Sequence, residues 1–262
     1  MGARISPGFT IIETVLFLSV TGLLVMGVLI GTGTALNAQR YQDSIESFKD
    51  LLQTQYAELS SVKNSRTNTW SCDATATAAS GGSQIRGQSD CLLVGRYVRI
   101  DRGDVTIYSV LARQTSTTED NDITRLDTNY AYNVDTTATD TRKMDWGTQI
   151  AWPASGSGSR TPTSPRSLGM LIIRSPHSGN IYTFTSDTVP DKSAINQTTF
   201  TDLIVGGNTI PGQGGRTLCV LSSGLARSGD TAIYINSFAT SASAIEVRTN
   251  QQLEALGETS RC

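Results

Sequence analysis

The chain is poor in charged residues and in the residue types that most enzymes use for catalysis. Asp, Glu, Lys and Arg together make up only 17% of its 262 residues, and the formal net charge is −2. A slightly acidic chain has no overall positive field, so the composition excludes nucleic-acid binding through such a field. Lysine is scarce, whereas serine, threonine and glycine are abundant. This composition is more typical of an exported, β-rich domain than of a cytosolic enzyme.

Histidine is nearly absent, and His177 is the only one in the chain. It lies in the turn-like stretch RSPHSGN, between Ser175 and Ser178. A serine triad needs a histidine that an acid orients beside a positioned nucleophile, so a solvated turn histidine is the simpler interpretation. The GxSxG, phosphate-loop and HExxH motifs are also missing. We therefore expect a protein without enzymatic activity and without a cofactor.

Cysteine is sparse as well, with Cys72, Cys91, Cys219 and Cys262 and no CxxC pair. With a single histidine in the chain, this spacing argues against a structural zinc site. An even number of cysteines in an exported chain indicates two disulfides, for which three pairings exist. We favour Cys72–Cys91 and Cys219–Cys262, because neither loop crosses the other and the second bond would hold the C-terminus in place.

A long apolar run near the N-terminus stands out from this polar composition. Residues 9–36 are apolar, glycine or threonine, apart from Glu13 and Ser19. The run is long enough to span a bilayer, which takes about 20 helical residues, and too long for an ordinary cleaved secretory signal. A carboxylate in a transmembrane segment costs roughly 2.5–3.5 kcal/mol on insertion scales and usually marks a function. The alternative is that Glu13 lies near the lipid headgroups and has no further role.

The residues around Glu13 carry a family resemblance. Gly8 is followed by FTIIE, which ends at Glu13, and then by the apolar run. This pattern resembles the N-terminal signal of type IV pilins and pseudopilins, and residues 1–8, with Arg4, resemble their short basic leader. The resemblance extends to about residue 60. It implies that a prepilin peptidase cuts between Gly8 and Phe9, that Phe9 is then N-methylated, and that Glu13 neutralises the amine of a neighbouring subunit.

The physical chemistry of a cleaved chain supports the role that the resemblance implies for Glu13. Cleavage would create a positive amine at Phe9, four residues before Glu13 and on the same helical face. The helix dipole favours a carboxylate near a helix N-terminus. In a low dielectric an amine and a carboxylate attract strongly, and each is costly if left alone. Such a pair can set the register of one helix against the next.

The helical pattern continues beyond Arg40, now with one apolar face. The apolar residues are three or four positions apart, at Tyr41, Ile45, Phe48, Leu52, Tyr56 and Leu59. No proline interrupts residues 9–60, so we expect one helix of roughly 50 residues, about 75 Å long. Residues 9–36 would form its transmembrane or filament-core half, and residues 37–61 an amphipathic half that packs on a sheet. A coiled coil is the alternative for the second half.

The remaining residues, 62–262, predict a disulfide-stabilised β-rich globular domain. Polar turn signals between apolar segments predict two hairpins and three further strands. The expected strands are at 91–100 and 104–113, 168–174 and 181–186, then 216–223, 231–236 and 243–248. We interpret residues 114–165 as a long surface insertion with at most short strands at 129–134 and 146–153, and residues 73–90 as a loop. The expected fold class is α+β, a long N-terminal helix packed on an antiparallel sheet, in agreement with the pilin resemblance.

An acidic stretch is a weaker candidate site. Its members could offer oxygen ligands to calcium: Glu119, Asp120, Asp122 and Asp127. Their spacing does not match an EF-hand, so a solvated acidic loop is the simpler interpretation and we expect no metal.

Two other patterns are also weak. Several arginines are close in sequence, and Arg96 and Arg102 could share a face of a sheet; the group is Arg86, Arg96, Arg99 and Arg102. Basic patches can bind DNA, yet a solvated strand face is the simpler interpretation, so DNA binding is unsupported. Asn196-Gln197-Thr198 matches an N-glycosylation acceptor, a signal that depends on the cell.

Together the residues and the resemblance predict a structural subunit of a type IV pilus or related filament. Without residues 1–8 the chain is long beside a usual major pilin, which favours a minor pilin. The implied partners are other pilin subunits, a prepilin peptidase and an inner-membrane assembly platform. The chain would lie in the bacterial cytoplasmic membrane before assembly and on the cell surface afterwards. The alternatives are a pseudopilin of a type II secretion system, a signal-anchored adhesin that never polymerises, and an anchored exported enzyme.

Overall fold

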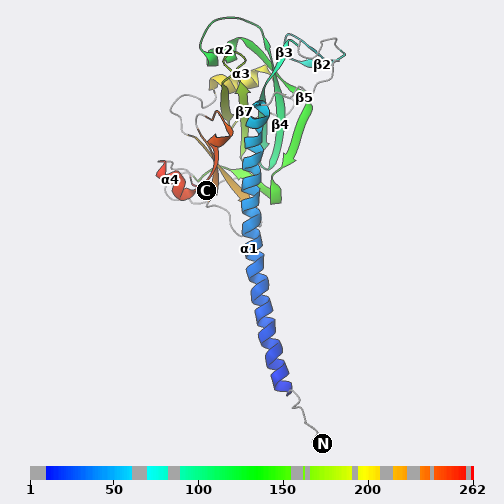
Figure 1. Cartoon of the computed structure of the whole chain (residues 1–262), viewed down its shortest axis with the longest axis vertical. Coiled ribbons are helices and arrows are strands. Elements are labelled where there is room, and N and C mark those ends of the chain that lie inside the picture. The colour runs from blue at the N-terminus through cyan, green and yellow to red at the C-terminus, as the bar shows by residue number, and fades with distance from the viewer. Residues whose placement is uncertain are drawn as a thin grey trace, which may run out of the picture.

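A computed structural model describes residues 10–60, 70–81, 89–154, 162, 166–190, 194–206, 215–222, 231–236, 239–257 and 261–262. One helix, α1 (Ile11–Ser60), has 50 residues and no interruption. Its first part projects from a β-rich domain as a free rod, and its second part lies along that domain (Figure 1). The expected α+β class, a long N-terminal helix on antiparallel sheets, is confirmed.

The strands form antiparallel sheets. In the described residues, the largest has five strands in the order β5-β4-β3-β7-β8, and the next has four in the order β11-β10-β9-β6. The five strands are β3 (Cys91–Asp101), β4 (Asp104–Gln114), β5 (Tyr130–Lys143), β7 (Ser167–Arg174) and β8 (Ile181–Ser186). The four are β6 (Thr148–Ala151), β9 (Arg216–Ser222), β10 (Thr231–Ile235) and β11 (Ile245–Thr249). Both expected hairpins and the three further expected strands are present.

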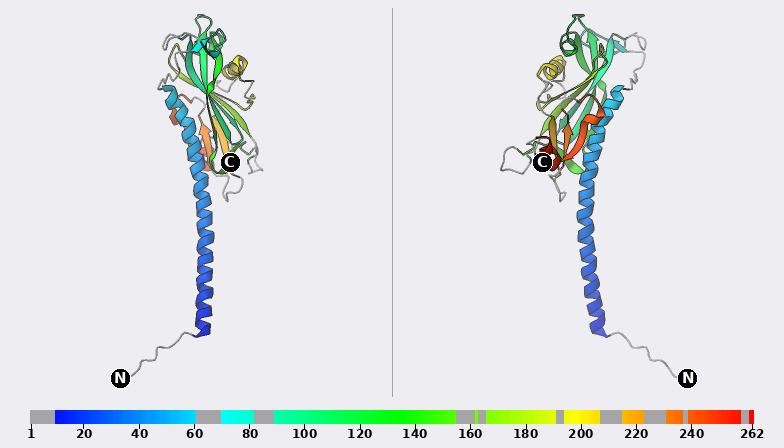
Figure 2. Two further views of the ribbon diagram at one scale, coloured as in Figure 1. Left: turned by 90° about the vertical axis from the view of Figure 1, so that its right-hand side faces the viewer. Right: turned by 60° about the vertical axis from the view of Figure 1, so that its left-hand side comes forward.

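Short elements complete the domain. A two-stranded sheet pairs β1 (Trp70–Cys72) with β2 (Ala78–Ser80), and β2 lies inside the segment expected to be a loop, residues 73–90. The short helices are α2 (Asp122–Thr128), α3 (Gln197–Gly206) and α4 (Asn250–Ala255), with 3-10 turns η1 (Asp145–Gly147) and η3 (Ala242–Ala244). In Figure 2, α1 covers one side of the sheets and α3 lies on the opposite side.

The amphipathic half of α1 (residues 37–60) joins the two large sheets. Every residue of the expected apolar stripe is buried, which confirms its prediction: Tyr41, Ile45, Phe48, Leu52, Tyr56 and Leu59. They share one core with residues of both sheets, such as Val98 of β3 and Leu218 of β9. Hydrogen bonds fix the position of the helix along the four-stranded sheet. The Tyr41 hydroxyl donates to the Val220 carbonyl at 3.0 Å, and Gln53 Nε2 donates to the Ala242 and Ile245 carbonyls at 3.1 and 2.9 Å.

A second core lies on the other face of the five-stranded sheet. Side chains alternate along a strand, so in β3 Val98 faces α1 while Tyr97 faces away from it. Tyr97 packs with Tyr132 of β5 and with Phe200 of α3, all of them almost completely buried. The five-stranded sheet is therefore covered on both faces.

The surface insertion expected at 114–165 is wrong for much of its length, although the short strands expected within it at 129–134 and 146–153 are present as parts of β5 and β6. β5 is a strand of 14 residues that pairs along β4 from Asp104↔Lys143 to Gln114↔Tyr130. Its residues Tyr130, Tyr132 and Val134 are buried, and β6 belongs to the four-stranded sheet. The segment is polar because β5 is an edge strand and exposes much of its length to solvent. Residues 155–161 and 163–165 of the expected insertion lie outside the described residues.

Candidate functional site

Glu13 lies in the first turn of α1, where it forms a reciprocal cap with Thr10. The Thr10 backbone N–H and its hydroxyl both lie 3.2 Å from Glu13 Oε2, and the Glu13 N–H donates to Thr10 Oγ1 at 3.3 Å. This is a capping box, which satisfies amide donors that the first turn of a helix leaves unpaired. This role of Thr10 was not predicted, although the spacing Thr-x-x-Glu is the sequence signature of a capping box. Gly8 and Phe9, the expected cleavage and methylation residues, lie outside the described residues.

The helix surface that follows Glu13 is apolar on all sides. From Ile11 to Leu36 its side chains are exposed, apart from the partly buried Thr21. An 18-residue window has a mean hydropathy of 2.3, and none of it is buried within the protein. A helix that is apolar all round is stable only when lipid or other helices cover it. By length and composition, α1 has the properties of a membrane anchor.

The cysteines lie in the β domain and form two disulfides. Cys72 is bonded to Cys91 and Cys219 to Cys262, with Cα–Cα distances of 5.8 and 5.3 Å. This is the pairing favoured from the sequence. The second bond holds the chain end, where the Ala154 N–H also donates to the Arg261 carbonyl at 2.8 Å.

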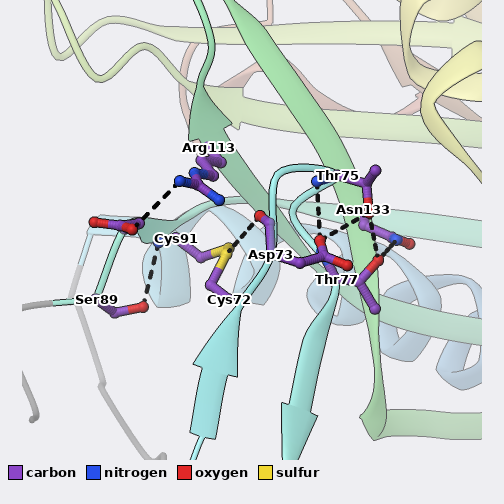
Figure 3. The surroundings of a disulfide bond; sticks show 9 residues. Cys72, Asp73, Thr75, Thr77, Ser89, Cys91, Arg113 and Asn133 are labelled. Carbon is purple, nitrogen blue, oxygen red and sulfur yellow. Dashed lines mark hydrogen bonds and ion pairs between the residues drawn. A yellow bond between two sulfur atoms is a disulfide. The ribbon is translucent and has the colours of Figure 1, made fainter. Parts of the chain in front are cut away.

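A hydrogen-bonded turn accompanies the first disulfide (Figure 3). Asp73 Oδ1 accepts the Thr75 hydroxyl at 2.7 Å, and the N–H groups of Thr75 and Thr77 at 2.9 Å each. The Thr75 hydroxyl and then the Thr77 amide lower the pKa of Asp73, because both stabilise its charged form. Asn133 of β5 donates to Thr77 Oγ1 at 2.8 Å. The disulfide loop is thus attached to the edge of the five-stranded sheet.

Asp122, one of the candidate calcium ligands, instead holds α2 against the β7–β8 turn. Its carboxylate accepts the hydroxyls of Ser175 at 2.6 Å and Tyr182 at 2.8 Å, and also that of Ser178. Burial raises the pKa of Asp122, but these three hydroxyls and the nearby His177 outweigh burial, so the net pKa is lowered. Among the described residues, no three acidic, histidine or cysteine side chains come together as metal ligands.

His177 lies in the same turn, as expected, but does not activate a serine there. Its backbone N–H donates to Ser175 Oγ at 3.2 Å. The single hydroxyl proton of Ser175 goes to Asp122, so Ser175 does not donate to the imidazole. The arrangement stabilises the turn and differs from a serine triad.

We expect Asp122→Asn to destabilise the protein by about 1 kcal/mol at neutral pH, because an amide replaces a carboxylate that accepts several hydroxyls. A lowered pKa in the folded state means that the stabilisation is present above the ordinary aspartate pKa and is lost as the pH falls through the folded value. Denaturant unfolding of the detergent-solubilised chain, from neutral to acidic pH, measures the difference in the free energy of unfolding between the variant and the unaltered chain. Asp202→Asn, at an exposed position of α3, is the control. An equal loss of stability in Asp122→Asn at every pH would contradict a stabilising role of the charged Asp122 carboxylate.

Three of the arginines that are close in sequence lie at different places on the five-stranded sheet. Arg96 faces α1, where its guanidinium pairs with Glu58 at 2.9 Å. Arg99 lies on the opposite face of β3, and Arg102 lies in the β3–β4 turn with a φ of 60°. Arg96 and Arg102 therefore do not share a sheet face, and Arg96, Arg99 and Arg102 do not form a single basic patch. Arg86 is outside those residues.

Asn196, the expected glycosylation acceptor, is exposed and precedes α3. Its Oδ1 accepts the Thr199 N–H at 3.4 Å, as a helix N-cap does.

These observations define a class, an α+β protein with an N-terminal helix long and apolar enough to cross a membrane and a disulfide-bonded β domain. No protein-family model, curated protein or solved structure matches the chain.

Proposed function

We propose that the chain is a structural subunit, a minor pilin, of a type IV pilus or related filament. The observation that carries this proposal is the position of Glu13 at the start of an exposed apolar half-helix (residues 11–36), continuous with a half-helix that is packed on a domain. A simple anchor needs the apolar surface but has no need of an acid within it, which is costly in lipid.

The two halves of α1 suit two successive environments. Before assembly, lipid would cover residues 11–36. In a filament the same residues would pack against the apolar halves of neighbouring subunits, because in the described part of the chain none of their most apolar 18-residue window is buried. Cleavage after Gly8 would supply the positive amine of Phe9, which Glu13 of another subunit can pair with. The β domain would then form the outer surface of the filament.

A second candidate is a signal-anchored adhesin that keeps residues 1–8 and never polymerises. One observation favours it: the capping box gives Glu13 a local structural role within its own chain, through Thr10. On this account Glu13 serves only the helix N-terminus.

The N-terminal mass of the chain separates the two candidates. Sheared surface filaments and the membrane fraction are each analysed by mass spectrometry. Chains in the filaments that begin with methylated Phe9 support the pilin proposal, and their abundance distinguishes a minor from a major subunit. A chain found only in membranes and still carrying residues 1–8 supports the anchored monomer and contradicts the proposal.

A further inference from the structure

The position of the β domain relative to a bilayer would be set by where the apolar half of α1 ends. The apolar run ends at Leu36, and the next charge is Arg40, four residues or about 6 Å further along the axis. Helical side chains lean towards the N-terminus, so the Arg40 guanidinium reaches back towards the apolar run. The headgroup layer on each side of a bilayer is about 5–8 Å thick. If residues 11–36 cross the bilayer, Arg40 therefore lies at the level of the lipid headgroups.

A tryptophan from a distant part of the chain lies at the same level. The Arg40 guanidinium carbon is 4.8 Å from the ring centroid of Trp146. Trp146 belongs to η1, and its side chain is 54% exposed, although tryptophan is usually well buried. A cation–π contact at an exposed site is worth about 0.5–1 kcal/mol, which is little for a ring of this size. The contact alone does not account for the exposure.

The backbone of η1 holds the tryptophan outward. Trp146 has a φ of 57°, in the left-handed region that residues with a Cβ rarely adopt. The loop is fixed to α1 on its buried side, where Ser44 Oγ and Thr148 Oγ1 share a hydrogen bond at 2.5 Å and lie within hydrogen-bond distance of the Asp145 carbonyl, at 3.2 and 2.8 Å. Ser44 and Thr148 are almost completely buried. Such a strained residue persists where its surroundings determine it, and it often marks a functional site.

The chemistry of the pair fits a phospholipid surface. The indole ring combines a large apolar face with an N–H donor, and tryptophans are enriched at membrane–water interfaces for this reason. A guanidinium pairs well with phosphate oxygens. Among the described residues, no carboxylate forms an ion pair with Arg40, so its charge is available to a phosphate. We propose that Trp146 and Arg40 form a docking site for phospholipid headgroups, which seats the β domain on the bilayer surface.

This inference rests on the membrane insertion assumed in the proposed function, and it does not require a filament. Docking fixes the height and rotation of the domain relative to the bilayer, because η1 is bound rigidly to α1. Extraction of a subunit from the membrane would break the contact.

Depth-dependent fluorescence quenching tests the docking site. The full chain carrying Trp70→Phe and Trp152→Phe has Trp146 as its only tryptophan. It is reconstituted into vesicles of phosphatidylcholine and phosphatidylglycerol, with or without phosphatidylcholine brominated near the headgroup end of the acyl chain. We expect brominated lipid to reduce Trp146 emission roughly twofold, since the ring lies at the interface.

A tryptophan inside the apolar run provides the matched control. Trp146→Phe and Phe17→Trp are added to the same background, and quenching by lipid brominated near the end of the acyl chain is measured. If this control is quenched and Trp146 is not, the apolar half of α1 inserts into the bilayer but Trp146 does not contact it, and the docking proposal is wrong. If neither is quenched, the apolar half does not insert, and both the docking site and the proposed function fail.

A second measurement avoids the multiple substitutions, because Trp152→Phe alters a packed contact. The Arg166 guanidinium carbon lies 4.2 Å from the centroid of the Trp152 ring. The quenching of the unaltered chain is compared with that of Trp146→Phe alone. A quenched component that disappears in Trp146→Phe supports docking, and equal fractional quenching of the two chains overturns it.

Discussion

A chain carrying Glu13→Gln is expected to be cleaved after Gly8 and yet to be nearly absent from sheared filaments. Under the proposed function, the Phe9 amine of one subunit is neutralised by Glu13 of its neighbour inside the apolar filament core. Removing one partner of a desolvated ion pair costs about 3–5 kcal/mol, which corresponds to a roughly hundredfold or larger loss of incorporation. Quantitative immunoblots of filament and membrane fractions measure the ratio of the two populations.

Glutamine is the informative replacement because of the capping box. Its amide oxygen can still accept the Thr10 N–H, and Gln serves at this position of a capping box as Glu does. Glu13→Gln therefore removes the charge and keeps the cap. Thr10→Ala does the reverse: it removes the hydroxyl that caps the Glu13 N–H and leaves the carboxylate in place.

The two variants separate the candidate functions. If the charge pairs with a neighbouring amine, Thr10→Ala chains enter filaments at close to the normal ratio, since loss of a cap costs only about 1 kcal/mol. If Glu13 acts as a cap alone, Glu13→Gln behaves like the unaltered chain. Normal incorporation of Glu13→Gln would remove the main support for an assembly role.

Local patterns in the sequence were sufficient for much of the fold. The stripe from Tyr41 to Leu59 has helical spacing and no proline, so the helix and its buried face followed from periodicity. The β3–β4 and β7–β8 hairpins followed from short polar turns between apolar segments. The disulfide pairing was favoured because the two loops do not cross and because one bond would hold the C-terminus in place. The residues that determine the helix and the hairpins are close in sequence, and the four cysteines allow only three pairings.

The division into two cores could not be read in this way. Only a short strand at 129–134 was expected in β5, where Tyr130, Tyr132 and Val134 show the period of two of a strand. The rest of β5 was read as surface insertion because Asp and Thr dominate its solvent-exposed positions. The role of Phe200 depends on its contact with Tyr97 and Tyr132, which only the folded chain brings together.

The candidate sites show the same contrast. Glu13 was found because the feature that marks it, an acid at the start of an apolar run, is contained in a few consecutive residues. Asp122 was read as a loop acid because its partners, Ser175 and Tyr182, come from the β7–β8 hairpin. The contact between Arg40 and Trp146 likewise joins two elements that are far apart in the chain.

Replacing both Cys219 and Cys262 by alanine is expected to destabilise the folded chain by about 4 kcal/mol. The bond closes a loop with a sequence separation of 43 residues, and the chain-entropy relation gives about 4 kcal/mol for a loop of that size. The same relation gives about 3 kcal/mol for Cys72–Cys91, whose separation is 19 residues. Alanine is used because a buried serine hydroxyl would add an unpaired polar group.

Packing increases the difference between the two bonds beyond loop entropy. Cys219 is completely buried in β9, and with Cys262 it packs in a small core that includes Ala151, Ala232 and Leu253. Without the bond, the contacts that remain to Arg261 and Cys262 among the described residues are the backbone contact with Ala154, the hydrogen bond from the Cys262 N–H to Asn250 Oδ1 and the ion pair of Arg261 with Glu254. Release of this segment would expose the edge of that core to water.

Denaturant unfolding of the detergent-solubilised chain under non-reducing conditions measures both effects, and limited proteolysis locates them. The variant without Cys219–Cys262 is expected to be cut near the C-terminus under conditions that leave the unaltered chain intact. The variant without Cys72–Cys91 is the matched control, since it lacks a bond of similar kind on a smaller loop. A larger loss of stability in that control would contradict the prediction. It would show that neither the larger loop nor the burial of Cys219 in β9 makes the C-terminal bond the more stabilising of the two.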